Sequence, residues 1–270
     1  MDIFKSVSTV ITELWDNKVR LMSLAKYELK NQHGGTFFGF LWNFLNPALQ
    51  ILVYWFVFAI GLRRGNDMEG VPYIVWLVIG IICWYYMNQA MLGTDMSIIN
   101  FSDVLKRMRF PMAIVPAKTI ASNLITHICS MVIVFIVVFV SGAKISSSIW
   151  LLPYYIFAST FFILGYSLIA STINVLFRDF HNLSNTAMRF LFFISPVMWE
   201  PSEDSALLNF IMKLNPFAYI LNGYRDTILY GWNLSENLES GIIFWVISIF
   251  MFVLGCVMHI RMRNKFIDTL

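Results

Sequence analysis

Apolar residues gather into long runs that are almost free of Asp, Glu, Lys and Arg, and six of these runs are candidate membrane spans. A helix needs roughly 20 mostly apolar residues to cross a hydrocarbon core of about 30 Å. The runs that contain the six predicted spans cover residues 31–62, 71–94, 119–143, 145–177, 180–199 and 240–260. This pattern predicts an all-α integral membrane protein with six transmembrane helices, and an even number of spans puts both termini on one side.

Residues 1–35 precede the first span and show a different pattern, in which apolar positions recur at helical spacing with basic residues between them. The apolar positions are Val7, Ile11, Leu14, Leu21, Ala25 and Leu29, and the basic ones are Lys18, Arg20, Lys26 and Lys30. We expect an amphipathic helix on the cytoplasmic membrane surface; a helix packed on protein is the alternative. Gly34 and Gly35 should end it. Pro47 should kink the first span, with residues 36–46 near the interface.

The loop between the second and third spans, residues 100–111, predicts a short basic helix. Ser102 is a suitable N-cap for it, and Pro111 would stop it. Val104, Leu105 and Met108 would then share one face. A solvated basic loop explains the same composition and remains the alternative.

Residues 200–239 face outward in this topology, yet they are apolar over 206–212 and 217–230. Asn215-Pro216, Gly223 and Gly231 break the segment into pieces that are too short to span a membrane. Two re-entrant helices fit this pattern, because irregular backbone at membrane depth survives only when it is buried in protein or lines a wet cavity. Two helices lying on the outer surface are the alternative.

Composition supports the membrane class and excludes others. Of the 270 residues, 58% are hydrophobic and 13% are charged, which is more apolar than a soluble domain and rules out disordered, collagen-like and disulfide-stapled proteins. Of the 19 lysines and arginines, 14 fall at the termini and in the second and fourth loops, and the positive-inside rule therefore places both termini in the cytoplasm. The net charge of +3 is too small to indicate a nucleic-acid partner.

The sequence contains no motif for catalysis, metal binding or cofactor binding. It lacks a Walker A phosphate loop and a His-Glu-x-x-His zinc motif. Isolated cysteines and histidines without ligand spacing are Cys83, Cys129, Cys256, His33, His127, His181 and His259. The absence of an acidic residue in mid-span disfavours an ion-coupled carrier. We therefore expect no catalytic site, metal or cofactor in this chain, and we expect His127 to hydrogen-bond between packed helices.

Five short motifs follow one another between residues 31 and 231. They are residues 33–47 (HGGTFFGFLWNFLNP), Phe110-Pro111 with Pro116, residues 177–180 (FRDF), residues 192–197 (FFISPV), and residues 214–217 (LNPF) with 224–226 (YRD). In this order they resemble type-2 ABC exporter permeases for lipid-linked polysaccharides. Within that family the chain is most similar to the teichoic acid translocation permeases of Gram-positive bacteria, whose relatives export O-antigen and capsule.

The resemblance implies an assembly of two permease copies, each with residues 36–270 as its transmembrane domain, and two copies of a separate ATPase that binds ATP and Mg²⁺. Residues 100–111 would form the coupling helix that sits in a cleft of the ATPase. Spans one and five would line a lateral gate, and the re-entrant helices would cap the channel outside. The expected coupling residues are Ser102, Val104, Leu105, Lys106, Arg107, Met108, Arg109 and Phe110.

The cargo implied by the resemblance is a polymer joined through a diphosphate to a polyprenyl carrier. We expect export of teichoic acid across the cell membrane of a Gram-positive bacterium, with membrane lipids around the chain. O-antigen or capsular polysaccharide, and small lipids or drugs, are the alternatives. Teichoic acid is a polyanion, yet few basic residues lie along the predicted spans.

Aromatic faces let a sugar or polyol chain slide, because they offer contact area without fixed hydrogen bonds. The aromatic residues expected along the substrate path are Phe37, Phe38, Trp42, Phe44, Tyr85, Phe190, Phe193 and Trp199. Packing between helices or contact with lipid is the alternative role for each of them.

Five charged residues, one single and two adjacent pairs, are expected to have specific partners. Arg189 is expected either to meet the lipid diphosphate or polymer phosphate, or to anchor the helix at the interface. Arg178 with Asp179 is expected to form an ion pair or a helix-end device, and a substrate site is the alternative. Arg225 with Asp226 is expected to be an ion pair that orders the re-entrant helices.

Overall fold

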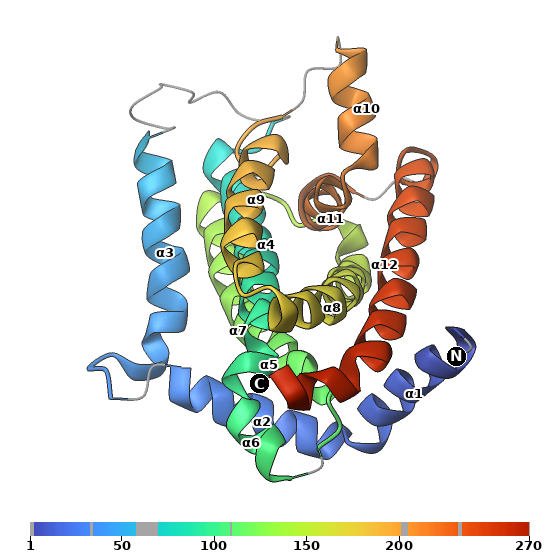
Figure 1. Ribbon diagram of the computed structural model, residues 1–270. Coiled ribbons are helices and arrows are strands. Elements are labelled where there is room, and N and C mark those ends of the chain that lie inside the picture. Colours follow the sequence, from blue (N-terminus) through green and yellow to red (C-terminus); the bar gives the residue numbers. More distant parts are fainter. Residues whose placement is uncertain are drawn as a thin grey trace.

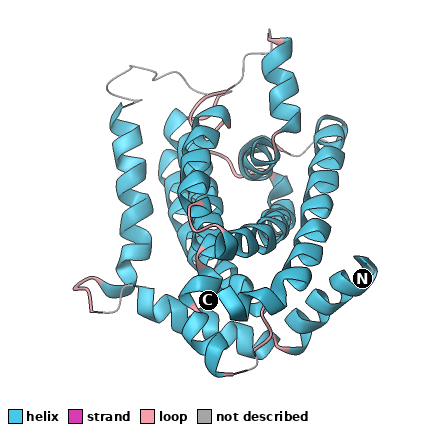
Figure 2. Ribbon diagram, in the orientation of Figure 1, coloured by secondary structure: helices cyan, strands magenta, loops and turns pink. Residues whose placement is uncertain are grey.

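The protein is a bundle of helices joined by loops (Figures 1 and 2). The computed structural model describes residues 3–32, 35–57, 70–108, 110–200, 205–231 and 234–269. The predictions made for His33, Gly34, Arg109 and the last part of the first span fall outside the described residues. Both ends of the chain lie at the same end of the bundle (Figure 1), which agrees with an even number of crossings.

Four helices in the described part of the chain are long and apolar enough to cross a membrane. They are α4 (Tyr73–Asp95), α7 (Ile114–Ser141), α8 (Leu152–Leu176), which continues from the 3-10 turn η3 (Ser147–Leu151), and α12 (Leu234–Thr269). They coincide with predicted spans two, three, four and six. Together with the composition, these helices identify an integral membrane protein.

Within the described residues, the helices at predicted spans one and five are shorter than a full crossing. Helix α3 (Trp42–Trp55) has 14 residues and follows the 3-10 turn η1 (Gly39–Leu41), and α9 (Phe180–Ile194) has 15 residues. The sequence placed the end of span five near Trp199, but Pro196 has no N–H and holds Ser195 in an extended conformation (ψ 150°). Helix α9 therefore ends earlier, and the total of six spans stays a prediction.

The N-terminal segment forms two helices where the sequence predicted one. Helix α1 (Ile3–Asp16) and α2 (Lys18–Gln32) are separated at Asn17, whose side-chain amide donates to the Glu13 carbonyl at 2.9 Å. They lie across the end of the bundle, α1 against α12 and α2 against α7 (Figure 1). Val10 and Ala25 are fully buried there. The alternative of a helix packed on protein thus describes one face of this segment, while apolar side chains such as Trp15 remain exposed.

The segment between α9 and α12 contains the two predicted short helices, in different environments. Helix α10 (Ala206–Leu214) has no buried residue, whereas α11 (Pro216–Arg225), with the π-helical turn η4 (Asp226–Tyr230), is buried among α4, α8 and α12. The burial in protein that a re-entrant helix requires is therefore present for α11 and absent for α10, and the place of both helices relative to the membrane stays a prediction. Asn215 caps α11 by accepting a hydrogen bond from the Phe217 N–H at 3.0 Å.

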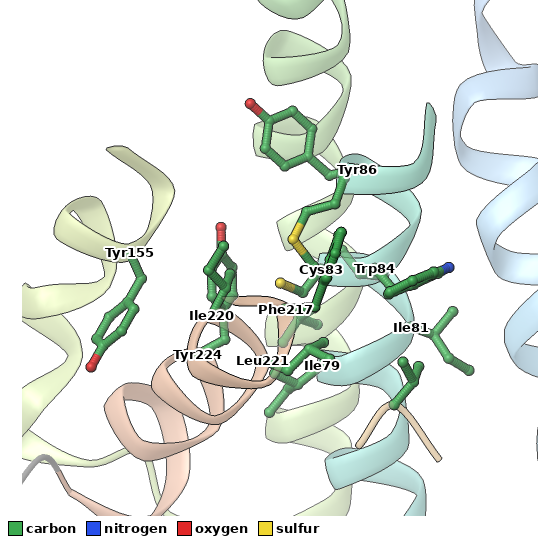
Figure 3. Close-up of a cluster of buried hydrophobic side chains, with 14 of the residues drawn as sticks. Ile79, Ile81, Cys83, Trp84, Tyr86, Tyr155, Phe217, Ile220, Leu221 and Tyr224 are labelled. Carbon is green, nitrogen blue, oxygen red and sulfur yellow. The ribbon is translucent and has the colours of Figure 1, made fainter. Parts of the chain in front are cut away.

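The central core is the place where α11 meets α4 and α8 (Figure 3). Helix α4 is apolar on all sides and is almost completely enclosed, as expected for a helix surrounded by protein. Tyr224 projects from α11 and shares a 2.9 Å hydrogen bond with His127 of α7, whose ring stacks on Tyr86 at 4.6 Å between centroids. The predicted role of His127 in joining packed helices is thereby confirmed.

Candidate functional site

A cleft of about 270 Å³ opens between α3, α4 and α9. Its lining combines aromatic rings, three side-chain amides and one guanidinium. The lining residues are Gln50 and Tyr54 of α3, Trp84 and Asn88 of α4, and Asn185, Met188, Arg189, Phe192 and Phe193 of α9. Polar groups that converge in a hollow beside aromatic rings can fix the orientation of a bound ligand.

Aromatic rings form the inner wall of this cleft. Phe192 stacks on Tyr54 with centroids 5.6 Å apart and meets Trp84 edge-on at 5.5 Å. Trp84 and Phe192 are buried, while Arg189 and Phe193 are exposed. The buried rings hold the wall rigid, and the exposed guanidinium can reach an anionic group, for which Arg offers a planar fork of donors.

The structure brings only some of the predicted path residues to the cleft. Arg189 and Phe193 line it, and the Trp199 indole N–H donates to the Phe193 carbonyl at 2.9 Å. Phe190 is exposed on α9 outside the lining. The remaining predicted residues on or before α3 lie away from it: Phe37, Phe38 and Trp42 form a chain of edge-to-face contacts, and Phe44 is half-buried.

Tyr85 lines a separate cavity and not the cleft. With Pro47, Gln89 and His127 it lines a cavity of about 10 Å³ between α3, α4 and α7, a volume sufficient for one water molecule. Tyr85 is therefore separated from the cleft residues.

The sequence analysis missed the three amides of the cleft, Gln50, Asn88 and Asn185. Each is a polar residue inside a predicted span, and such residues usually face the interior of a membrane bundle. A search for amides within the apolar runs would have selected them, but only the packing of α3, α4 and α9 shows that they converge.

The short helix predicted between spans two and three is present as α6 (Ser102–Arg107), which follows the short α5 (Ser97–Asn100). We keep the name coupling helix for α6, and its coupling role stays a prediction. Ser102 is its first helical residue and Phe101 occupies the N-cap position, so the predicted cap is wrong by one residue. Met108 is extended (φ −150°, ψ 150°) and exposed, because the helix ends before it; its predicted place on the face of Leu105 is also wrong. Leu105 is buried, Val104 is half-buried, and Lys106 and Arg107 are exposed.

Two phenylalanines, one on either side of α6, are in contact with each other. Phe101 and Phe110 meet edge-on at 5.3 Å, so the residues between them form a projecting loop. Lys118 lies 5.4 Å from the Phe101 ring and pairs with Glu28 of α2, while Arg20 of α2 lies 5.8 Å from the Phe110 ring. Helix α2 thus supports both ends of the coupling helix.

Helix α1 is fastened to the same region through Glu13. One carboxylate oxygen of Glu13 accepts a hydrogen bond from Arg263 of α12 at 2.6 Å, and the other accepts from the Ala113 N–H at 3.4 Å. Ala113 is the N-cap residue of α7, where the backbone N–H groups lack helical partners. The N-terminal segment therefore links α7, α12 and the coupling helix.

Arg178 and Asp179 lie exposed on the turn between α8 and α9. Their side chains are not joined by an ion pair in the described part of the chain. Asp179 is instead the N-cap residue of α9, and its carbonyl accepts from the N–H groups of Asn182 and Leu183. Of the two predicted roles, the helix-end device describes this position.

Arg225 is 2% exposed and holds three backbone carbonyls together. Its guanidinium donates to Pro196 O at 2.6 Å, Val197 O at 2.9 Å and Trp76 O at 3.4 Å. The same group lies 3.3 Å from the Trp76 ring centroid. Arg225 thus fixes the end of α9 to α4 and α11. An ion pair with Asp226 stays a prediction.

Comparison with known proteins places the chain among transporters. A family described as "ABC-2 type transporter" matches residues 19–229. The chain is 28% identical to the O-antigen export system permease protein RfbA of Myxococcus xanthus, over 80% of this chain and 82% of that protein. It is 24% identical to the protein of the same name from Klebsiella pneumoniae, over 93% of this chain and 94% of that protein. Because the family match covers most of the chain, the protein belongs to the ABC-2 type transporter permeases.

Proposed function

We propose that this chain is the membrane subunit of an ATP-driven exporter that moves a lipid-linked polysaccharide of the O-antigen type outward across the cytoplasmic membrane. In this proposal, two copies work with two copies of a separate ATPase that binds ATP and Mg²⁺. The observation that carries the proposal is the cleft between α3, α4 and α9. It lies between the helices at predicted spans one and five, where the family resemblance expects a lateral gate.

The chemistry of the cleft favours a glycan over a polyanion. Rings such as Tyr54 and Phe193 suit sugar faces, and the amides of Gln50, Asn88 and Asn185 suit hydroxyl groups. Among the described lining residues, Arg189 is the charged one, which matches one carrier diphosphate better than a chain of phosphates. The relatives named as O-antigen permeases point the same way. Teichoic acid and a Gram-positive source, which the sequence favoured, have no such support.

The experiment that tests the proposal identifies the cargo. The protein is depleted in its host, and the polymers that accumulate on polyprenyl carriers inside the membrane are analysed. Phosphate-free glycan chains on a diphosphate carrier are the expected result. Polyol-phosphate chains would show that the cargo is teichoic acid instead. Absence of any accumulated polymer would overturn polymer export altogether and favour small lipids or drugs.

Arg189→Gln is expected to weaken cargo capture. Loss of a charge-assisted hydrogen bond is worth about 1.5–3 kcal/mol, so the apparent affinity for lipid-linked cargo should fall about tenfold or more. Cargo-stimulated ATP hydrolysis by the reconstituted complex, titrated with purified lipid-linked polymer, measures this. Arg178→Gln, at an exposed arginine outside the cleft, is the matched control. Equal titration curves for Arg189→Gln and the wild type would remove Arg189 from the substrate path.

Arg107→Glu is expected to uncouple the permease from its ATPase. Arg107 is exposed near the tip of the projecting loop, so charge reversal leaves the fold intact while it disrupts a complementary partner surface, where like charges cost several kcal/mol. Co-purification of the ATPase and export should both fall about tenfold or more. Lys26→Glu, at an exposed site on α2, is the control. Normal ATPase retention and export by Arg107→Glu would disprove the coupling role of α6.

A further inference from the structure

A buried carboxylate lies where α4 ends, seven residues before the coupling helix begins. Asp95 is fully buried, and its oxygen Oδ1 accepts a hydrogen bond from the Tyr166 hydroxyl of α8 at 3.0 Å. Its oxygen Oδ2 faces Nδ1 of His181, in the first turn of α9, at 3.4 Å. A buried carboxylate is costly unless neighbouring groups satisfy it, so the groups around Asp95 determine whether this junction is stable.

A second set of contacts closes these residues into a ring. The buried side-chain amide of Asn174 donates to the backbone carbonyl of Asp95 at 3.0 Å, and its oxygen accepts from the backbone N–H of His181 at 3.1 Å. The Tyr166 hydroxyl also lies 2.5 Å from the Ser184 hydroxyl of α9. We name Asp95, Tyr166, Asn174, His181 and Ser184 the polar ring. It joins the end of α4, the second half of α8 and the start of α9.

The polar ring is connected on one side to the coupling helix. Ser97 begins α5 two residues after Asp95 and donates to the Thr94 carbonyl at 2.7 Å. Ile98 of α5 is fully buried and packs in one cluster with Leu105 of α6 and Val175 of α8. A displacement of α6 therefore acts on α5 and on the residues that hold the ring, because packed side chains transmit displacement with little compression.

On its other side the ring is connected to the cleft. Asn185 follows Ser184 directly, and Arg189 lies about one turn further along α9. The opposite end of α9 is held by Arg225 through Pro196 and Val197. A change at the ring would therefore tilt α9 about its fixed outer end and move the cleft wall relative to α3.

The side chains of Asp95 and His181 can adopt two arrangements, one without and one with a hydrogen bond between them. Oδ2 of Asp95 and Nδ1 of His181 are buried atoms without a hydrogen-bond partner among the described residues. Their separation of 3.4 Å exceeds the usual range for an N–H···O bond. A small movement of α9 toward α4 would close this gap and form the bond. Such a pair of arrangements is the kind of element that can link two distant sites.

We propose that the polar ring is the joint through which movement of the coupling helix changes the position of α9, with Asp95 and His181 as positioning residues of the transport cycle. The proposal rests on the proposed function, because it assumes an ATPase bound at α6 and cargo at the cleft. Neither residue touches the cleft, so cargo affinity in the resting state does not depend on them.

The test uses the permease–ATPase complex in proteoliposomes with Asp95→Asn and His181→Gln. Asp95→Asn keeps the acceptor for Tyr166 and removes the charge that faces His181. The expected result is a loss of cargo-stimulated ATP hydrolysis of about fivefold or more, with cargo affinity and ATPase retention unchanged. The double variant should lose no more than either single variant, because both break one contact.

A distance measurement reports the movement itself. Spin labels at Leu49→Cys of α3 and Thr186→Cys of α9, both exposed, are introduced in a Cys129→Ser background. Trapping the complex with ATP should change this distance in the otherwise unmodified protein and leave it unchanged in Asp95→Asn. Thr160→Val is the matched control, since it removes a partly buried hydrogen bond between α8 and Tyr86 of α4 that does not reach α9.

The outcomes separate the two proposals. Wild-type protein without cargo-stimulated hydrolysis would contradict the proposed function, whereas the ATP-dependent distance would still test the polar ring. The proposal that the ring is a joint would be overturned if Asp95→Asn keeps the cargo-stimulated ATP hydrolysis of the wild type, or loses no more of it than Thr160→Val does. Failure of both ring variants to fold, with Thr160→Val folded, would make the ring a purely structural element and would also overturn the proposal.

Discussion

Replacing Arg225 with methionine should destabilise the packing of α11 against α4 and the end of α9. The buried guanidinium satisfies the carbonyls of Pro196, Val197 and Trp76, and these acceptors belong to the backbone, so no side-chain change removes them. Replacing a buried ionic group by an apolar isostere is often harmless when both partners are replaced. Here the carbonyls remain and lose their donor, at about 1–3 kcal/mol for each buried group.

The expected destabilisation of Arg225→Met is therefore at least about 3 kcal/mol, measured as the shift in thermal unfolding of the detergent-solubilised protein. Arg225→Lys keeps the charge but not the planar fork that reaches three acceptors, and should recover only part of the loss. Lys213→Met is the control, because its pair with Glu239 at 2.7 Å is exposed and worth about 1 kcal/mol or less. Equal stability of Arg225→Met and the wild type would contradict this account.

Gly223→Ala should be nearly as damaging, although helix propensity predicts the reverse. Alanine is favoured over glycine inside a helix by about 1 kcal/mol, and Gly223 lies within α11. A Cβ at this position would overlap the ring of Tyr155 on α8, which is fully buried. Figure 3 shows Tyr155 and Tyr224 on either side of this approach of α8 to α11. Overpacking typically costs about 1–3 kcal/mol or more, so the steric cost exceeds the gain from propensity.

A pair of variants separates the steric cause from a general intolerance of α11. Gly223→Ala combined with Tyr155→Leu should be more stable than the sum of the single effects predicts, because the smaller side chain makes room for the methyl group. Gly93→Ala is the control, since its Cβ would meet a single methyl group of Thr119 at 3.1 Å. Strict additivity of the two changes in thermal unfolding would show that the contact with Tyr155 is not the cause.

Length and hydropathy were sufficient to predict most of the helices. Four predicted spans coincide with α4, α7, α8 and α12, because a crossing needs a long apolar stretch and the sequence displays such stretches directly. The motif at residues 192–197 also lies where α9 ends, and Phe110-Pro111 lies just after α6. The exact ends were less predictable, since Ser195-Pro196 and Met108 stop their helices through local backbone geometry.

The functional sites were harder to predict from the sequence than the helices. Arg225 was counted as a cation of an outer loop, yet its side chain is buried. His181 was predicted to be an isolated histidine and Asp95 follows the second predicted span, yet they face each other across 86 residues of chain. The sequence does not show which helices are neighbours, and contacts between residues so far apart depend on that arrangement.

Composition, hydropathy and motifs along the chain were enough to identify a membrane protein, to place most of its helices and to indicate its family of transporters. These properties follow from local composition and from the order of the motifs, which can be read without knowing how the helices pack. The packing of the helices was needed to show which amides and rings form the cleft, and that α11 is buried while α10 is exposed. It was also needed to show that the residues of the polar ring meet between α4, α8 and α9, because such sites exist only where separate helices pack together.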